Sequence, residues 1–462
     1  MKSQQRLPRP SRLVNAANHV FPALWKSRLL TSPELDADAI CEKVERQAGL
    51  DDYGSEWFRR PLDLLVEALR EEASLSPLGL FGAIGQLEKV LRDRLWTQQW
   101  LGEHPEIERR ALRRPVFVVG PMRSGTTRLH RLLASDERFS HLRFFETISP
   151  TPRPGFRHGE TDKRRDYARR ILALVHGLNP NTAVIHPTGP LEPEEELGLL
   201  VASMWGMKHE AQWNVPTYGR WAEGQDATPA YEHMARLLRL VGWARGEDDQ
   251  RPWVLKTPQH MLDLPALLRV FPDARIIFTH REPQAVVGSS CSLVWNQMII
   301  HSNRVDAQRI GREWLRKTAL QIERMQHARE RLDESQRIDV HYEDMDRDWR
   351  GVMKRIYEFL DMDIRPALPA MSHYLRGAER KRTRHPHRYS LSAFGLDQNE
   401  VGEQFEGYMG AFDLAAPARL SAARKQPRKV YDAPAPAYAR PVGGWDAGKR
   451  GPVSARTVTA RR

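Results

Sequence analysis

Short apolar runs separated by helix-length segments dominate the middle of the chain. Five such runs, each typical of a buried strand, lie at residues 115–119, 142–145, 253–256, 274–280 and 338–342. Between them apolar residues recur at helical spacing, as at Leu129, Leu132 and Leu133. Strands that alternate with helices predict an α/β fold, a parallel sheet flanked by helices on both faces. Ligands of such sheets bind beyond the carboxyl ends of the strands.

The pattern before these strands is helical throughout. Apolar residues recur at three- and four-residue spacing at Leu64, Leu65, Ala68 and Leu69, and again at Leu87, Val90, Leu91 and Leu95. His104 and Pro105 interrupt this pattern. We therefore expect an N-terminal helical region over residues 35–112, followed by the α/β domain over residues 113–423.

The distribution of charge sets the two ends of the chain apart. The net charge is +12. Residues 424–462 contain ten Lys and Arg against two acids, and residues 1–13 contain four and no acid, so the segment between them is neutral. We expect a basic N-terminal segment over residues 1–34 and a disordered basic tail over 424–462, which is rich in Pro, Ala, Gly and Arg. The neutral body disfavours a nucleic-acid-binding protein, which stays as an alternative.

Composition is that of an ordinary globular protein, with 40% apolar and 28% charged residues. No run approaches the roughly 18 consecutive apolar residues of a membrane-spanning helix, and the first 30 residues lack the pattern of a signal peptide. Cys41 and Cys291 are the only cysteines, too few for a disulfide framework or a multi-cysteine metal site. We expect a cytoplasmic protein that has no transmembrane segment and binds no metal.

The first strand leads into a loop with the form of a phosphate-binding site. Residues 120–127 read Gly-Pro-Met-Arg-Ser-Gly-Thr-Thr and are followed directly by a helix. The backbone N–H groups of such a turn and the helix dipole favour an anion. Nucleoside triphosphatases carry Lys where this chain has Thr126, and the strands that end at Lys256 and His280 offer no metal carboxylate. A P-loop kinase dependent on a nucleoside triphosphate is therefore kept only as an alternative.

The loop resembles the 5′-phosphosulfate loop of sulfotransferases that use 3′-phosphoadenosine 5′-phosphosulfate (PAPS), with Met122 between Pro121 and Arg123 as a small departure. Arg281 and, eight residues later, Ser289 are similar to the 3′-phosphate site of this family, and residues 386–395 are similar to a segment near the end of many bacterial members. The resemblance covers about residues 113–410. It implies the P-loop NTPase-like sulfotransferase fold and PAPS as co-substrate, held by Arg123, Ser124, Gly125, Thr126, Thr127, Arg281, Ser289, Arg388 and Tyr389.

The same resemblance implies the catalytic groups. Arg123 would neutralise the leaving phosphate, and Lys256 would reach the sulfuryl oxygens. Tyrosylprotein and many carbohydrate sulfotransferases carry a catalytic Glu after the strand beside the loop, which here is Glu146. The cytosolic small-molecule branch has a His two residues after the Lys, but that position is Pro258, and His260 lies two residues further on. Glu146 is favoured as the base and His260 is its rival.

The acceptor pocket is expected within residues 150–245. This region contains His186, Glu194, Glu195, Trp205, Trp213 and Trp221. Aromatic side chains suit a sugar, a phenol or a sterol equally. The sequence therefore predicts transfer to a hydroxyl of a small molecule or glycan, without choosing the acceptor or the oligomeric state.

Overall fold

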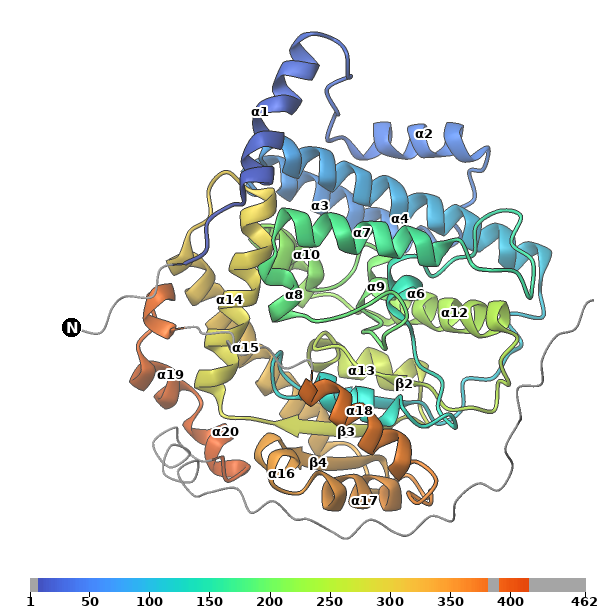
Figure 1. The fold of residues 1–462 in the computed structure, drawn as a ribbon, viewed down its shortest axis with the longest axis vertical. Helices are drawn as coiled ribbons and strands as arrows, with labels where there is room; N and C mark the ends of the chain where they lie inside the picture. The colour runs from blue at the N-terminus through green and yellow to red at the C-terminus, as the bar shows by residue number, and fades with distance from the viewer. Residues whose placement is uncertain (1–6, 381–389, 415–462) are drawn as a thin grey trace, which may run out of the picture. The chain divides into compact units, whose positions relative to one another are not determined.

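The structure, a computed structural model, describes residues 7–380 and 390–414. Its centre is a parallel sheet with the strand order β2-β1-β3-β4 (Figure 1). The strands are β1 (Val116–Val119), β2 (Val254–Leu255), β3 (Arg275–His280) and β4 (Arg337–His341). These four strands and their parallel arrangement confirm the predicted α/β fold.

Side chains of β1 alternate between two hydrophobic cores, one on each face of the sheet. Phe117 and Val119 belong to one core, and Val116 and Val118 to the other. Burial of such a side chain contributes about 1.5–3 kcal/mol relative to exposure. The first core is covered by α12 (Thr228–Arg245), α13 (His260–Val270), α14 (Pro283–His301) and α15 (Ala307–Glu330). The second is covered by α5 (Thr126–Leu133), α16 (Tyr342–Arg347), α17 (Trp349–Phe359) and α18 (Leu368–Arg380).

The predicted strand over residues 142–145 is wrong. Isolated bridges connect this part of the chain to its neighbours, and the short helix α6 (Phe144–Ile148) begins within the predicted strand. The Glu146 carboxylate accepts a hydrogen bond from the backbone N–H of Arg143 at 2.8 Å, which caps the helix. Because this cap fixes the first turn of α6, the apolar run does not continue as a strand.

The helices predicted over residues 35–112 are present and have a core of their own. They are α2 (Ala37–Ala48), η1 (Glu56–Phe58), α3 (Arg59–Glu71) and α4 (Pro77–Glu103). Leu65, Leu69 and Leu87 lie in this core, together with Trp213 and Tyr218 from the segment around α11 (Pro216–Glu223). The helical region and the sheet therefore belong to one compact unit.

The segment over residues 1–34 contains a helix, α1 (Arg12–Lys26). Ser11 begins it, because its hydroxyl accepts a hydrogen bond from the Val14 N–H at 3.2 Å. Val14 is the buried residue of α1 and packs with Leu178 and Ile300. The rest of the helix lies largely on the surface.

The remaining elements are α7 (Arg164–Leu178), α8 (Asn181–Ile185), α9 (Leu197–Val201), α10 (Lys208–Gln212), η2 (Glu334–Gln336), η3 (Leu391–Phe394), α19 (Gln398–Gln404) and α20 (Glu406–Ala411). Of these, α7, α8, α9 and α10 lie between α4 and the sheet in Figure 1. No helix within the described ranges is both long and apolar enough to cross a membrane. The thiols of Cys41 and Cys291 are free and buried. The predicted tail over residues 424–462 lies outside the described residues.

Candidate active site

The predicted phosphate loop joins the end of β1 to the first turn of α5. Gly125 has a φ of 87° and Arg123 a φ of 69°, so both residues lie in the left-handed region. A Cβ atom on Gly125 would lie 2.6 Å from a ring carbon of Tyr342. Glycine is required at this position because both the backbone angle and the neighbouring ring exclude a side chain. A loop of this form before a helix suits a phosphate or sulfate group.

The loop is tied to the neighbouring strand β3. The Ser124 hydroxyl donates to the carbonyl of Pro121 at 2.8 Å and lies 2.8 Å from the hydroxyl of Thr279. A Cβ atom on Gly120 would lie 2.0 Å from the same Thr279 oxygen. The close approach of the two strand ends therefore fixes where the loop begins. Thr126, the first residue of α5, is buried.

Arg123, Arg281 and Ser289 lie together, although 158 residues separate the two arginines. Arg123 donates through Nε to the Ser289 hydroxyl at 3.1 Å and through Nη1 to the carbonyl of Ile185 at 3.0 Å. Arg281 donates to the carbonyl of Arg123, and its guanidinium lies 4.0 Å from the centre of the Tyr342 ring. Two cations and a hydroxyl thus gather beside the loop, an arrangement suited to phosphate groups.

Lys256 reaches the phosphate loop from the end of β2. Its ammonium group forms an ion pair with Glu195 and donates to the Thr127 hydroxyl at 3.2 Å. The backbone N–H of Lys256 donates to the Glu196 carboxylate at 2.7 Å. Although the lysine side chain is almost fully buried, its charged end therefore has both an acid and a hydroxyl as partners.

His186 and Glu194 form a second polar pair near the loop. The Nε2 atom of His186 lies 3.0 Å from the Glu194 carboxylate. That carboxylate raises the pKa of His186 above the ordinary histidine value, whereas burial opposes the rise. Although burial disfavours its charged form, His186 and Lys256 hold the pKa of Glu194 well below its usual range. The pair has the form in which a carboxylate orients an imidazole and leaves the other ring nitrogen for chemistry.

Glu146 lies away from these groups. Its carboxylate is 1% exposed and, besides capping α6, forms an ion pair with Arg245, with a distance of 2.7 Å between Oε1 and Nε. Glu146 does not line the cavity that contains the loop. The structure therefore gives this carboxylate structural partners and does not bring it together with Arg123 and Lys256.

His260 is also enclosed by the protein. Its Nδ1 atom lies 2.8 Å from the Tyr231 hydroxyl, and its Nε2 atom lies 2.5 Å from the Glu196 carboxylate. The side chain is fully buried and does not line the cavity. Glu196 also accepts a hydrogen bond from the backbone N–H of Lys256, so His260 helps to hold the end of β2 in place.

A large cavity connects the phosphate loop to an apolar interior. Its volume is about 1680 Å³, and its polar end includes Arg123, Thr126, Thr127, His186, Glu194, Glu195 and Arg281. Apolar side chains from α1, α4, α7 and α14 form much of the remaining wall, among them Phe21, Phe81, Val90, Ile171, Leu174 and Ile300. The loop and the long apolar wall therefore face the same open cavity. Lys256 and Ser289 do not line it themselves, but their partners Thr127, Glu195 and Arg123 do.

Further polar side chains lie on this cavity at α10 and at the end of α14. Lys208 donates to the Gln86 side chain at 3.2 Å, and Gln212 donates to Nε2 of His301 at 2.9 Å. Burial lowers the pKa of Lys208 to about 8 and that of His301 to about 4. His301 and Ser289 belong to the same helix, and their spacing in sequence places them about 18 Å apart along its axis.

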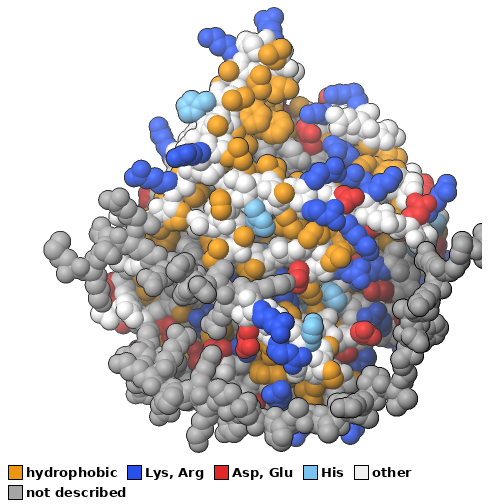
Figure 2. All heavy atoms as spheres, viewed as in Figure 1, with side chains coloured by type: hydrophobic (Ala, Val, Ile, Leu, Met, Phe, Trp, Pro, Cys, Tyr) orange, Lys and Arg blue, Asp and Glu red, His pale blue; other side chains and the backbone are white. Residues whose placement is uncertain are grey.

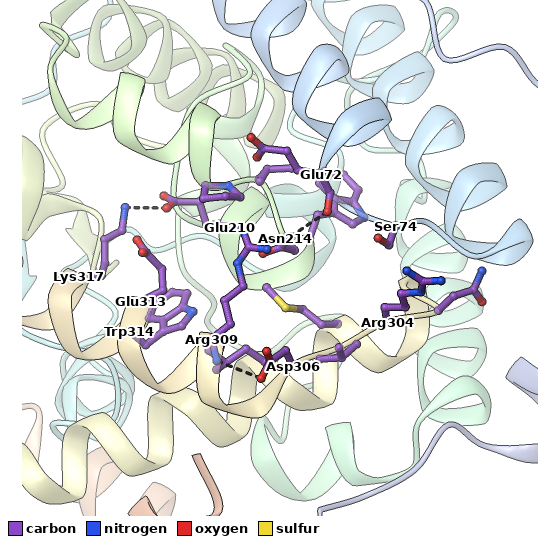
Figure 3. Close-up of a pocket in the computed structure, with 17 residues that line it drawn as sticks. Glu72, Ser74, Glu210, Asn214, Arg304, Asp306, Arg309, Glu313, Trp314 and Lys317 are labelled. Atoms are coloured by element: carbon purple, nitrogen blue, oxygen red, sulfur yellow. Dashed lines mark hydrogen bonds and ion pairs between the residues drawn. The ribbon is translucent and has the colours of Figure 1, made fainter. Parts of the chain in front are cut away.

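A separate cavity of about 540 Å³ is lined by Glu210, Glu313 and Lys317 (Figure 3). Trp213, predicted for the acceptor pocket, lines this cavity and not the large one. Lys317 forms ion pairs with Glu210, at 2.6 Å, and with Glu223. Oxygen atoms of Glu210, Glu223 and Glu313 lie within 4.8 Å of one another, a spacing that could suit a cation. Lys317 is shared by two of these carboxylates, Arg316 binds Glu313 at 2.6 Å, and Arg220 binds Glu313 at 2.7 Å. Three cations of the chain therefore face the three carboxylates.

The other predicted residues fall in three places. His186, Glu194 and Glu195 line the large cavity, whereas Trp205 is buried in the main core and Trp221 packs against it. Arg388 and Tyr389 lie outside the described residues. Sequence analysis missed Thr279 and Tyr342. Their position at the carboxyl ends of β3 and β4 is the signal that could have identified them.

Comparison with known proteins gives consistent results. Residues 115–366 match a family model described as Sulfotransferase family. The omega-hydroxy-beta-dihydromenaquinone-9 sulfotransferase Stf3 of Mycobacterium bovis is 25% identical over 329 residues, which are 66% of this chain and 78% of the relative. The crystal structure of sulfotransferase STF1 from Mycobacterium tuberculosis H37Rv is 32% identical with a TM-score of 0.70, covering 80% of this chain and 98% of that chain. STF9 from Mycobacterium avium is 26% identical with a TM-score of 0.73, covering 84% and 99%.

Proposed function

The chain belongs to the sulfotransferase family, and we propose that it transfers the sulfuryl group of PAPS to a hydroxyl of a large, mostly apolar acceptor. The observation that carries the proposal is the single cavity in which the phosphate loop faces a long apolar wall. One end of this space suits a phosphosulfate, and the other end suits a hydrophobic molecule.

The contacts around the loop support PAPS as donor. Backbone N–H groups of residues 123–127 would hold the 5′-phosphosulfate, and Arg281 with Ser289 would hold the 3′-phosphate. Gly125 lets the Tyr342 ring pack closely against the loop, because it has no side chain to meet that ring. PAPS would supply the activated sulfuryl group. We infer that no metal is needed, because Arg123, Arg281 and Lys256 provide the positive charge.

A nucleoside triphosphate-dependent kinase finds less support. Such an enzyme needs a carboxylate near the strand ends to hold its magnesium ion. Glu194 and Glu195 line the cavity beside the loop, but each already has a partner, Glu194 in His186 at 3.0 Å and Glu195 in Lys256. Although burial opposes the shift, His186 and Lys256 hold the pKa of Glu194 well below its usual range.

The wall of the cavity supports an acceptor with an extended apolar body. The relative named above acts, by its name, on a hydroxylated menaquinone, which is a lipid. In this chain His301 adds a polar group about 18 Å from Ser289 along α14, and Lys208 and Gln212 of α10 add two more on the same cavity. We infer a hydroxylated lipid-like acceptor whose hydroxyl lies near Lys256 and whose body extends towards α10.

We propose His186 as the general base in place of Glu146. His186 would accept the proton of the acceptor hydroxyl through Nδ1, while Glu194 holds Nε2. As the acceptor oxygen bonds to sulfur, the bond between sulfur and the phosphate oxygen breaks, and that oxygen gains the negative charge. Lys256 would stabilise the sulfuryl oxygens, and Arg123 the leaving phosphate.

Thermal unfolding with nucleotides tests the donor. We expect adenosine 3′,5′-bisphosphate to raise the unfolding temperature, because a ligand that binds only the folded state stabilises it. ADP and magnesium ATP should have little effect. Arg281→Met should remove most of the stabilisation, whereas the exposed Arg365→Met should keep it. Stabilisation by magnesium ATP with none from the bisphosphate would contradict the proposal and favour a kinase.

A further inference from the structure

Large apolar side chains are exposed around one part of the described surface. Seven of these side chains lie on α1, just after it, or on the helices α4, α7 and α8 that line the large cavity. They are Leu13, Val20, Leu29, Leu30, Phe81, Leu174 and Val184, and Leu29 is 74% exposed. We call these seven residues the α1 rim. Only Leu191 is a further large apolar residue of this kind among the described residues. The concentration of such side chains in one region marks an interaction surface.

The α1 rim is continuous with the interior of the large cavity. Phe81, Leu174 and Val184 belong to the rim and also line the cavity. Phe21 of α1 lines the cavity as well, and its ring stacks on Phe81 with 4.9 Å between ring centres. A molecule bound to the rim would therefore meet an apolar path that leads towards the phosphate loop.

Residues 8–18, at the start of α1, contact the rest of the protein, whereas the residues after them project from the surface. Val14 is buried, the Asn18 side chain accepts a hydrogen bond from the Leu78 N–H at 2.9 Å, and the Trp295 side chain donates to the carbonyl of Pro8 at 2.9 Å. Figure 2 shows apolar side chains gathered over the projecting α1, with basic side chains at its tip. The helix thus presents a fixed apolar surface.

Charge on α1 itself has one sign. Residues 7–33 contain Arg9, Arg12, Lys26 and Arg28, all exposed, and no Asp or Glu, and the first acid after them is the exposed Glu34. Exposed apolar side chains bordered by cations are typical of helices that lie in the interface of anionic membranes. A second copy of the chain fits less well, because a symmetric contact through this surface would bring like charges together.

We propose that the α1 rim docks on the surface of an anionic lipid bilayer, with the mouth of the cavity facing the lipid. The apolar side chains enter the acyl boundary, and the four basic residues contact lipid phosphates. The docking itself follows from the surface alone. Delivery of an acceptor from the bilayer into the cavity rests on the proposed function.

Sedimentation of the full chain with vesicles tests the docking. We expect binding to phosphatidylcholine vesicles that contain phosphatidylglycerol, and weak binding to pure phosphatidylcholine. The double variant Lys26→Glu with Arg28→Glu should bind the anionic vesicles at least about 25-fold more weakly. The double variant Val20→Asp with Leu29→Asp should bind them more weakly at both low and high salt. Lys354→Glu with Arg355→Glu is the matched control, since both residues are exposed on α17, at the far end of the unit from α1 in Figure 1.

A fluorophore on Val20→Cys distinguishes docking through α1 from contact through any other basic segment. Its emission should shift to the blue when anionic vesicles are added, because residue 20 enters an apolar environment. Vesicle binding without this shift, or equal binding by wild type and the α1 variants, would overturn the proposal. Self-association of the wild-type chain without lipid, if the same α1 substitutions abolish it, would also overturn the proposal and assign the rim to a second copy. Stabilisation by adenosine 3′,5′-bisphosphate should be unchanged in every α1 variant, so a failure of docking is separable from a failure of the donor assignment.

Discussion

Replacing Glu146 with glutamine distinguishes a structural carboxylate from a catalytic one. The carboxylate binds the Arg143 N–H at 2.8 Å and the Arg245 guanidinium, with 2.7 Å between Oε1 and Nε. Glutamine keeps the size and an acceptor oxygen but removes the charge. Loss of one partner from a buried ion pair costs about 3–5 kcal/mol when the other charge is left alone. Because Arg245 keeps Glu247 at 3.1 Å, we expect a loss of about 2–3 kcal/mol in the free energy of unfolding.

Two measurements check this prediction. Urea unfolding gives the free energy, and initial rates at equal concentrations of folded protein give kcat for sulfuryl transfer to a hydroxylated lipid. We expect kcat to stay close to the wild-type value, whereas removal of a general base would lower it by about 10²–10⁴-fold. Such a drop, with unchanged unfolding free energy, would refute the structural role of Glu146. In a double-mutant cycle, Glu146→Gln with Arg245→Met should cost less than the two single changes together, because the residues are in contact.

Three further variants test the site. Gly125→Ala places a side chain at a left-handed backbone position, so calorimetry should show adenosine 3′,5′-bisphosphate binding weakened at least about tenfold. Gly85→Ala, which has open space around its Cβ, should leave this binding unchanged. Because Glu194 raises the pKa of His186, the rate of sulfuryl transfer should increase with pH through a value above 6.5. His186→Gln should abolish this rise on the acid side of the pH profile. A rise that persists in the variant would exclude His186 as the base. Lys256→Met should lower kcat by about 10²–10³-fold with a smaller change in bisphosphate affinity; the reverse pattern would assign Lys256 to donor binding alone.

The sheet and the loop were predictable because their signals are local. β1, β2 and β3 are mostly apolar and buried, whereas the edge strand β4 alternates Ile338 and Val340 with polar residues. The loop is marked by Gly120 and Gly125, and both positions exclude a side chain in the structure. Arg281 and Ser289 were predicted from the resemblance to the sulfotransferase family, and in the structure each forms a hydrogen bond with Arg123.

The partners of the candidate bases were not predictable because they are distant in sequence. Residues 142–145 are mostly apolar, which suits a strand, but Glu146 caps a helical turn there and pairs with Arg245, 99 residues away. His260 occupies a suitable position along the chain, yet Tyr231 and Glu196 enclose it. Short-range sequence patterns do not contain such contacts. They also cannot predict a cavity whose wall is formed by helices as distant in sequence as α1 and α18.

The burial of both native cysteines makes this chain suited to site-specific labelling. Burial raises the pKa of the Cys291 thiol to about 12 and also raises that of Cys41, so thiolate is scarce at neutral pH. Maleimide reagents attack the thiolate, and neither sulfur is accessible to them in the folded state. A single cysteine introduced on the surface, for example at Val20 on α1, would therefore be the position modified, without any prior removal of the native ones.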